Sequence, residues 1–273
     1  MLKNVFRVSS IFACLASAEI AWAEDGAHPL IADRVFVQAG AYLPSKKLKL
    51  TVEGSIQGDG REFDFEKVTG GSDNDEVFEL ELAWRFGEKW SLRAQHYAVD
   101  SSRKAVLGSD ITWRDETILA GSSVAAGSEF SVSRVFFGRT LDSRDNIDAG
   151  LGIGLHWLEI GAFIRPDIII ASADVSAAQV SGPLPNAGGW YFWSPSGKWA
   201  FGGRLDWFEA SIGKFAGGIT NVSAGANYQL FKNVGVGLNY QMFDLDVDVD
   251  SDKWHGRTEI SYRGPFIYFS GNW

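Results

Sequence analysis

The chain has 273 residues, of which 45% are hydrophobic and 14% aromatic, and it contains 11 Trp and 31 Gly at a mean hydropathy of −0.06. Its formal net charge of −9 argues against nucleic acid as a partner, because surfaces that bind nucleic acid are basic. No stretch approaches the roughly 18 uninterrupted apolar residues that a membrane-spanning helix needs, which excludes a helical membrane protein.

The N-terminus is typical of an export signal. Two basic residues precede the apolar run Val8–Leu15, and Ala21-Trp22-Ala23 is a small-x-small cleavage site, with Ala16–Ala18 as an earlier alternative. We therefore expect a signal peptide at 1–23, a short periplasmic leader at 24–32 and the mature domain at 33–273. The only cysteine, Cys14, falls in the signal peptide, so no disulfide is expected in the mature chain.

Apolar side chains alternate with polar or small ones throughout the mature domain. The hairpin Asn221–Met242 is the clearest example, with amides and glycines on one face and aliphatic or aromatic residues on the other. This pattern is typical of a transmembrane β-barrel, which meets lipid on one side and a polar lumen on the other. We expect an all-β fold, a closed antiparallel transmembrane β-barrel of ten strands, with eight or twelve as alternatives. The other strands are predicted at Arg34–Leu43, Val77–Phe86, Trp90–Val99, Glu129–Leu141, Ile147–Leu158, Leu184–Trp193, Trp199–Ala210 and Thr258–Trp273.

The connections between these strands differ in length. Short turns follow the second, fourth, sixth and eighth strands, whereas long connections follow the first, third and fifth, the last of them at Arg165–Pro183. A tight loop is predicted at Gly213–Gly218. The charged stretches Lys46–Ser55 and Arg61–Lys67 also alternate, and we interpret them as an extension of the barrel wall above the membrane. Because outer-membrane barrels have short periplasmic turns and long external loops, both chain ends are predicted to lie in the periplasm.

The alternation changes phase within two strands. Apolar residues occupy even positions up to Met242 and odd positions from Phe243 onward, and a similar change occurs at Trp157-Leu158. Such a change predicts either a β-bulge or the point at which the strand leaves the membrane.

Three stretches resemble a known family. VGVGLNYQMFDLDVDVDSDKWHG at 234–256, RGPFIYFSGNW at 263–273 and GLHWLEIGA at 154–162 are similar to segments of a Gram-negative outer-membrane β-barrel family within the broad OmpA/OmpW-like superfamily. The resemblance covers most of the mature chain. It implies the barrel fold and an outer-membrane location, and it carries no catalytic residues onto this chain.

Ten charged residues fall on positions predicted to face the lumen. A barrel of eight to ten strands is filled by its own side chains, so we interpret these residues as a network of paired charges that closes the lumen to bulk solutes. A conducting pore is the alternative. The predicted network consists of Arg34, Glu79, Glu81, Arg85, Arg93, Asp148, Arg204, Asp206, Glu259 and Arg263.

An acidic run follows the hairpin. Carboxylates two apart on a strand share one face, so Asp246, Asp248, Asp250 and Asp252 form a candidate Ca²⁺ site, although the glycine and the closing glutamate of an EF-hand are missing. The favoured interpretation is a solvated acidic rim without a metal. His255 lies near Asp250 and Asp252, and an Asp–His pair can activate water, so a membrane-embedded hydrolase is a further alternative.

The last residues resemble the assembly signal of outer-membrane proteins, with Ile267 and Phe269 two apart and an aromatic Trp273. The function predicted from the sequence is therefore an integral outer-membrane barrel with a structural or surface-binding role and a charge-filled lumen. A narrow channel for small solutes or hydrophobic compounds is the alternative. We expect no enzymatic activity and no cofactor. The expected partners are outer-membrane lipid, lipopolysaccharide and, during insertion, the barrel-assembly machinery, and the expected state is a monomer.

Overall fold

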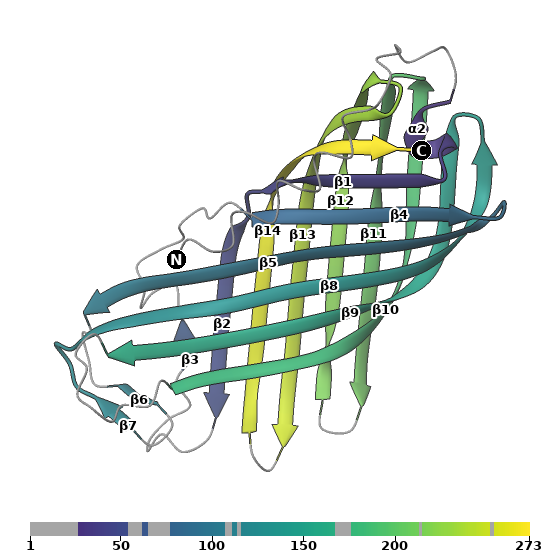
Figure 1. Ribbon diagram of the computed structural model, residues 1–273. Helices are drawn as coiled ribbons and strands as arrows, with labels where there is room; N and C mark the ends of the chain where they lie inside the picture. Colours follow the sequence, from purple (N-terminus) through teal and green to yellow (C-terminus); the bar gives the residue numbers. More distant parts are fainter. Residues whose placement is uncertain are drawn as a thin grey trace.

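The protein forms a closed, ten-stranded antiparallel β-barrel, which confirms the predicted fold class (Figure 1). The structure is a computed structural model and describes residues 27–53, 62–64, 77–106, 111–113, 116–166, 176–212, 215–251 and 254–273. Each barrel strand pairs with the next along the chain, and β1 pairs with β14 to close the sheet. The barrel strands are β1 Val35–Tyr42, β4 Val77–Phe86, β5 Trp90–Val106, β8 Ser123–Arg144, β9 Ile147–Pro166, β10 Ser176–Ser196, β11 Trp199–Ile212, β12 Phe215–Phe231, β13 Val234–Ser251 and β14 Trp254–Asn272.

Smaller elements extend this barrel at both ends. The strand β2 (Ser45–Glu53) pairs with β14 beyond the point where β1 stops, and β3 (Glu62–Asp64) pairs with β2. Both strands extend the barrel wall, as predicted for these charged stretches. A short hairpin consists of β6 (Ile111–Trp113) and β7 (Glu116–Ile118). The single turn of helix α2 (Pro29–Ala32) lies near the C-terminal end of β14 (Figure 1). Among the described residues, no helix is long and apolar enough to cross a membrane.

Several strands run further than the sequence pattern predicts. β5 continues to Val106, β10 already begins at Ser176, and β12 begins at Phe215. The predicted loops Arg165–Pro183 and Gly213–Gly218 are therefore wrong at all of their described residues, which belong to strands. The predicted signal peptide, 1–23, and residues 24–26 of the predicted leader lie outside the described residues.

The polarity of the wall inverts part of the way along the strands, and this explains the phase change. On β13, Gln241, Phe243 and Leu245 are all buried, and the register with β12 is continuous through this region. The β-bulge predicted as one explanation is therefore absent from this part of β13. The inward face instead changes from polar to apolar at Phe243, while the outward face changes from apolar to acidic at Asp244. The same change occurs at Trp157-Leu158 on β9, where Leu158 is buried.

The two halves of the barrel consequently have opposite architectures. The half next to the short turns has an apolar outer surface and a polar interior. The other half has polar outward residues and an apolar interior, as a water-soluble β protein does. Rings of Tyr97, Phe130, Phe243 and Tyr262 meet inside it, with centroids 4.9 Å apart for Phe130–Tyr262 and 5.5 Å apart for Phe130–Phe243.

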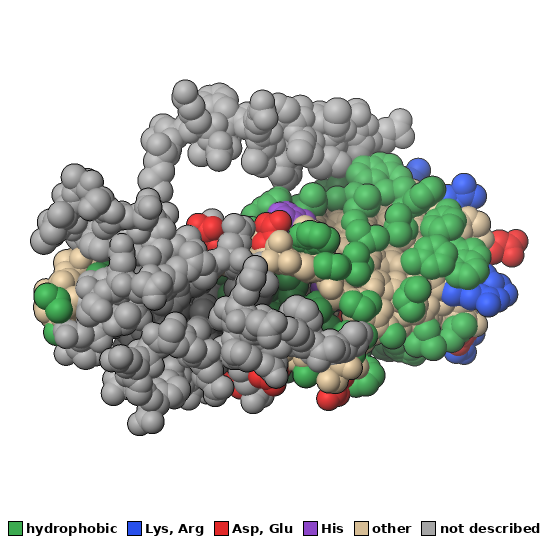
Figure 2. Space-filling model, turned by 90° about the horizontal axis from the view of Figure 1, so that it is seen from below, with side chains coloured by type: hydrophobic (Ala, Val, Ile, Leu, Met, Phe, Trp, Pro, Cys, Tyr) green, Lys and Arg blue, Asp and Glu red, His purple; other side chains and the backbone are tan. Residues whose placement is uncertain are grey.

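The apolar outer surface forms a belt around the first half, to which strands on all sides of the barrel contribute. Figure 2 shows one side of this belt. Its side chains are large and well exposed, among them Phe78 (61%), Ile153 (67%) and Phe269 (63%). Aromatic side chains lie in contact near the short turns, for example Trp90 with Phe137 and Trp199 with Phe201. Such a continuous apolar surface is unfavourable in water and needs an apolar environment.

The wall divides in the second half, between β10 and β11. The β10–β11 pairing ends at Ala187–Trp207, whereas β10 stays paired with β9 as far as Ser176 and β11 stays paired with β12 as far as Ile212. Figure 1 shows β5, β8, β9 and β10 turning away from the group that contains β11 to β14 and β2. Pro183 and Pro185 lie on β10 just beyond the last pair, and because proline has no N–H it cannot donate to a neighbouring strand.

Candidate functional site

The structure places seven of the ten predicted lumen residues inside the barrel. Six of them are nearly or fully buried and Arg85 is partly exposed, and all project from strands of the half with the apolar belt. The seven are Glu79, Glu81, Arg85, Arg93, Asp148, Arg204 and Asp206.

The inward prediction is wrong for the other three. Arg34 is exposed at the edge of the barrel, directly before β1. Arg263 lies on the outer surface, where its Nη2 contacts Asp244 Oδ2 at 2.9 Å and its side chain is 50% exposed. Glu259 shares the outward face of β14 with Arg263, whereas Ile260 and Tyr262 are buried. For Arg263 and Glu259 the physical reason is the inversion of polarity, because in their half of the barrel the charged residues face water outside and the apolar residues face inward. Arg34 instead lies beyond the end of β1 at the rim next to the short turns, where its backbone carbonyl accepts the Arg85 N–H.

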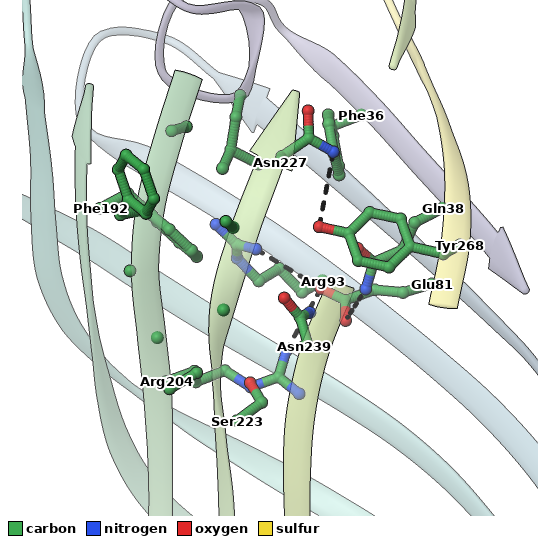
Figure 3. Close-up of a pocket in the computed structure, with 18 residues that line it drawn as sticks. Phe36, Gln38, Glu81, Arg93, Phe192, Arg204, Ser223, Asn227, Asn239 and Tyr268 are labelled. Carbon is green, nitrogen blue, oxygen red and sulfur yellow. Dashed lines mark hydrogen bonds and ion pairs between the residues drawn. The ribbon is translucent and has the colours of Figure 1, made fainter. Parts of the chain in front are cut away.

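The centre of the site is a salt bridge that crosses the barrel (Figure 3). Arg204 Nη1 lies 3.2 Å from Glu81 Oε1. Glu81 belongs to β4 and Arg204 to β11, and these strands are five positions apart in either direction around the closed sheet, so the pair spans the full diameter. Arg93 reaches the same carboxylate oxygen at 3.4 Å, and the Gln38 amide donates to Glu81 Oε2 at 3.0 Å.

A second ion pair lies beside the first and was not anticipated. Arg134 on β8 contacts Asp206 on β11 at 2.7 Å, and neither side chain is exposed to solvent. The alternation of β8 gave little sign of Arg134, because its inward neighbours Val132 and Phe136 are apolar like the outward Val135. Arg204 Nε lies 3.6 Å from Asp206, which links the two pairs into one network.

Amide side chains complete this network. Glu79 is fully buried, and its Oε1 accepts from the Gln95 amide at 2.8 Å and from the Gln241 amide at 3.0 Å. Gln241 comes from β13, three strands from β4, so this contact also crosses part of the lumen. Among the described residues, the interior holds four arginines (85, 93, 134 and 204) and four carboxylates (79, 81, 148 and 206), of which Glu79 is bonded to amides and the other three are paired with arginines.

A separate group of contacts fastens the segment before β1 to the mouth of the barrel. Arg85 Nη2 donates to the Leu30 carbonyl at 2.6 Å and pairs with Asp148 at 2.6 Å, and the Asn272 amide donates to Asp33 at 2.7 Å. His28 Nδ1 accepts the Leu30 N–H at 3.1 Å and so caps α2. Burial lowers the pKa of His28 to about 4, because the charged imidazolium loses its hydration. The contacts of Arg85 and Asn272 hold the helix at the end of the barrel with the short turns, where Leu30 lines the lumen cavity.

The candidate acidic site is only partly within the described residues. Asp252 lies outside them, and nothing is described of the side chains of Asp250 and His255, although their backbones are directly opposite each other in the β13–β14 ladder. Asp246 and Asp248 lie on the outward face of β13. Within the described residues, no group of three or more His, Cys, Asp or Glu side chains is placed to hold a metal ion.

The predicted assembly residues lie on the outer surface near the short turns. Ile267 is 55%, Phe269 63% and Trp273 52% exposed. The backbone of Trp273 pairs in both directions with Val35, at 2.7 and 2.9 Å, where β1 and β14 close the barrel. Their use in assembly stays a prediction.

No family model and no curated protein sequence matches the chain. Solved structures with a similar arrangement include the attachment invasion locus protein Ail of Yersinia pestis, at 9% identity and a TM-score of 0.36, with 86% of this chain and 99% of that chain covered. The toluene transporter TbuX of Ralstonia pickettii is 12% identical with a TM-score of 0.38, over 92% of this chain and 78% of that one. The transport unit of the autotransporter AIDA-I from Escherichia coli is 9% identical with a TM-score of 0.40, over 95% and 94%. At these low scores, the likenesses carry no argument about function.

Proposed function

We propose that the protein is an integral β-barrel of the Gram-negative outer membrane, with a lumen closed by its own side chains and a structural or surface-binding role. The Arg204–Glu81 pair, which joins opposite walls of the barrel, is the observation that carries the closed lumen. The residues around it support closure, since Glu79 and Asp206 have no solvent exposure.

The outer belt supports the membrane location. Exposed aromatic residues on β11 extend from Trp199 to Trp207. These eight steps correspond to roughly 26 Å along the strand and roughly 20 Å along the axis at a tilt of about 40°, close to the apolar height of about 25 Å in outer-membrane barrels. Beyond Trp207 the outward residue is Glu209, which suits water or headgroups.

The partners follow from this placement. Lipid surrounds the belt, and lipopolysaccharide meets the polar outward residues of the second half, with the four two-residue or three-residue turns on the periplasmic side. We further propose that the barrel is a monomer and that the barrel-assembly machinery inserts it. No catalytic role is assigned to Asp250 and His255, and a hydrolase would require that a His255→Ala variant lose activity.

Conductance tests the closed lumen. The purified barrel, reconstituted in planar bilayers, is expected to show no stable open channels of porin size. Stable channels would overturn closure and favour the alternative of a narrow channel for small solutes, while uptake of hydrophobic compounds into vesicles without ionic current would favour a hydrophobic channel. Outer-membrane fractionation followed by heat-modifiable gel migration tests the location, and recovery of the protein as a soluble periplasmic species would overturn it.

A further inference from the structure

The buried ion-pair network of Glu81, Arg93, Arg134, Arg204 and Asp206 forms a plug in the lumen. A small cavity lies inside this plug, between the Glu81 ion pairs and helix α2. Its volume is about 30 Å³, and Figure 3 shows the side chains that surround it. One wall is formed largely by residues without bulky side chains, including Gly202, Gly203 and Gly225. A cavity of this size holds about two water-sized particles, since one water needs roughly 10–15 Å³ on this measure.

The charged groups that line this cavity do not balance. They are two guanidinium groups, Arg93 and Arg204, and one carboxylate, Glu81, which both arginines share. The next carboxylate, Asp206, is held by Arg134 at 2.7 Å and lies 3.6 Å from Arg204. The ion pair of Arg93 with Glu81 is therefore long, at 3.4 Å, and shared, and Asp148, which also attracts Arg93, is itself paired with Arg85 at 2.6 Å.

Arg93 is also short of hydrogen-bond partners. Its side chain is only 5% exposed, and its Nε is buried without a partner. The rings of Trp190 and Phe192 lie 5.8 and 5.4 Å from the guanidinium carbon, which offers a cation–π contact but no acceptor. A buried, charged donor without an acceptor is costly, so the cavity next to it favours an occupant that accepts hydrogen bonds and carries negative charge.

We propose that this cavity binds one small monovalent anion of the halide class, chloride under ordinary conditions, between Arg93 and Arg204. The anion would make the charge of the lining residues neutral and accept the free Arg93 donor. The remaining room suits one water, which would donate to the buried and unpartnered Oδ1 of Asn227 on the same wall. The proposal rests on the closed plug proposed above, in which the anion is a fixed constituent.

The volume of the cavity and the net charge of its lining residues determine which ions it can bind. Phosphate, sulfate and organic carboxylates are too large for about 30 Å³. Cations are disfavoured because the lining carries one net positive charge. The structure therefore assigns the cavity to a single halide ion rather than to a nutrient or a metal.

Bromide in place of chloride tests the site directly. Crystals of the full chain grown in sodium bromide are expected to show one anomalous bromine peak within hydrogen-bond distance of Arg93. A cavity that contains water only would overturn the proposal. In solution, chloride or bromide is expected to raise the apparent Tm by roughly 2–4 °C relative to gluconate at equal ionic strength.

Two variants separate the anion site from a general effect of salt. Arg93→Gln is expected to abolish the difference between halide and gluconate, because the unpaired charge is removed. Arg144→Gln changes charge equally at an exposed position and is expected to keep the difference. If the Tm difference between halide and gluconate were unchanged in Arg93→Gln, the proposal would be overturned. If this variant does not fold, the anomalous bromine peak in crystals of the unaltered protein decides the question. If bilayer recordings show no channels and the crystals show no bromide, the anion site is overturned and the closed lumen stands. If the recordings show stable channels and the crystals show bound bromide, the closed lumen is overturned.

Discussion

Arg134 and Asp206 form an ion pair at 2.7 Å in which neither side chain is exposed to solvent, although the two residues are 72 positions apart in the sequence. The strands that carry them, β8 and β11, are three positions apart around the barrel. Burial of two charges costs several kcal/mol each, and their attraction offsets this cost only while both partners are present. The pair therefore favours one arrangement of the lumen more than it adds to overall stability.

Loss of one partner is expected to be costly. Asp206→Leu leaves Arg134 as an uncompensated buried charge, so we expect a loss of about 3–5 kcal/mol in the free energy of unfolding. Arg134→Met combined with Asp206→Leu removes both charges and is expected to be more stable than Asp206→Leu alone. Denaturant unfolding of the barrel in lipid or detergent measures both.

An exposed pair provides the control. Arg144 and Asp142 are 2.6 Å apart, but their side chains are 63% and 44% exposed. Water screens such a pair, so Arg144→Leu is expected to leave the unfolding curve unchanged. If Asp206→Leu behaved in the same way, water would have access to the plug and the lumen would not be closed.

Much of the fold could be predicted from alternation alone, and β4 was found with the same limits, Val77–Phe86. Alternation states which residues share a face but not which face is inside. In the half with the apolar belt apolar residues face outward, and in the other half they face inward, so Arg263 was assigned to the lumen although it lies on the outer surface. The phase change at Met242-Phe243 indicates where the inward face turns from polar to apolar, because β13 continues through it without a change of register.

The partners within the site could not be predicted in the same way. Contacts such as Arg204–Glu81 depend on which strands face each other across the barrel, and this follows from strand number and closure rather than from any local pattern. Arg134 was missed because β8 is apolar on both faces near it. The uncharged residues of the network, among them Gln95 and Gln241, cannot be distinguished in the sequence from other polar lumen residues. Only the structure shows that both donate to Glu79.

Close packing against a glycine gives a second test of the filled lumen. A Cβ at Gly237 would meet the ring of Tyr268, which lies directly opposite on β14 and is buried. Gly237→Ala is therefore expected to destabilise the barrel by about 1–3 kcal/mol through overpacking. Gly182→Ala is the matched control, since nothing lies within 4 Å of its added carbon. Heat-modifiable gel migration across a temperature series compares the two, and equal midpoints would contradict a tightly packed interior at Tyr268.

The contacts of α2 are expected to depend on pH through His28. The pKa of His28 is lowered from 6.5 to about 4 when the segment is docked, so the undocked state binds more protons between these values. Docking is then fully stable above about pH 6.5 and weakens as the pH falls toward 4, by at most about 3 kcal/mol. Hydrogen exchange of the Ile31 and Ala32 amides, which donate to the His28 carbonyl, reports this opening after correction for intrinsic rates. His28→Asn keeps an acceptor for the Leu30 N–H without a titrating group, and its opening is expected to be independent of pH in this range.

The division of the wall between β10 and β11 is expected to depend on two prolines. Pairing of β10 with β9 continues past Pro183 and Pro185, so we infer that their missing N–H groups face β11, where pairing stops at Ala187–Trp207. In Pro183→Thr/Pro185→Thr, both donors are restored in residues that favour strands. We expect the β10–β11 ladder to lengthen, with the two threonine amides protected from hydrogen exchange and slower exchange in residues 208–212. Freely exchanging threonine amides would instead mean that packing within the two halves of the wall, and not the missing donors, holds these strands apart.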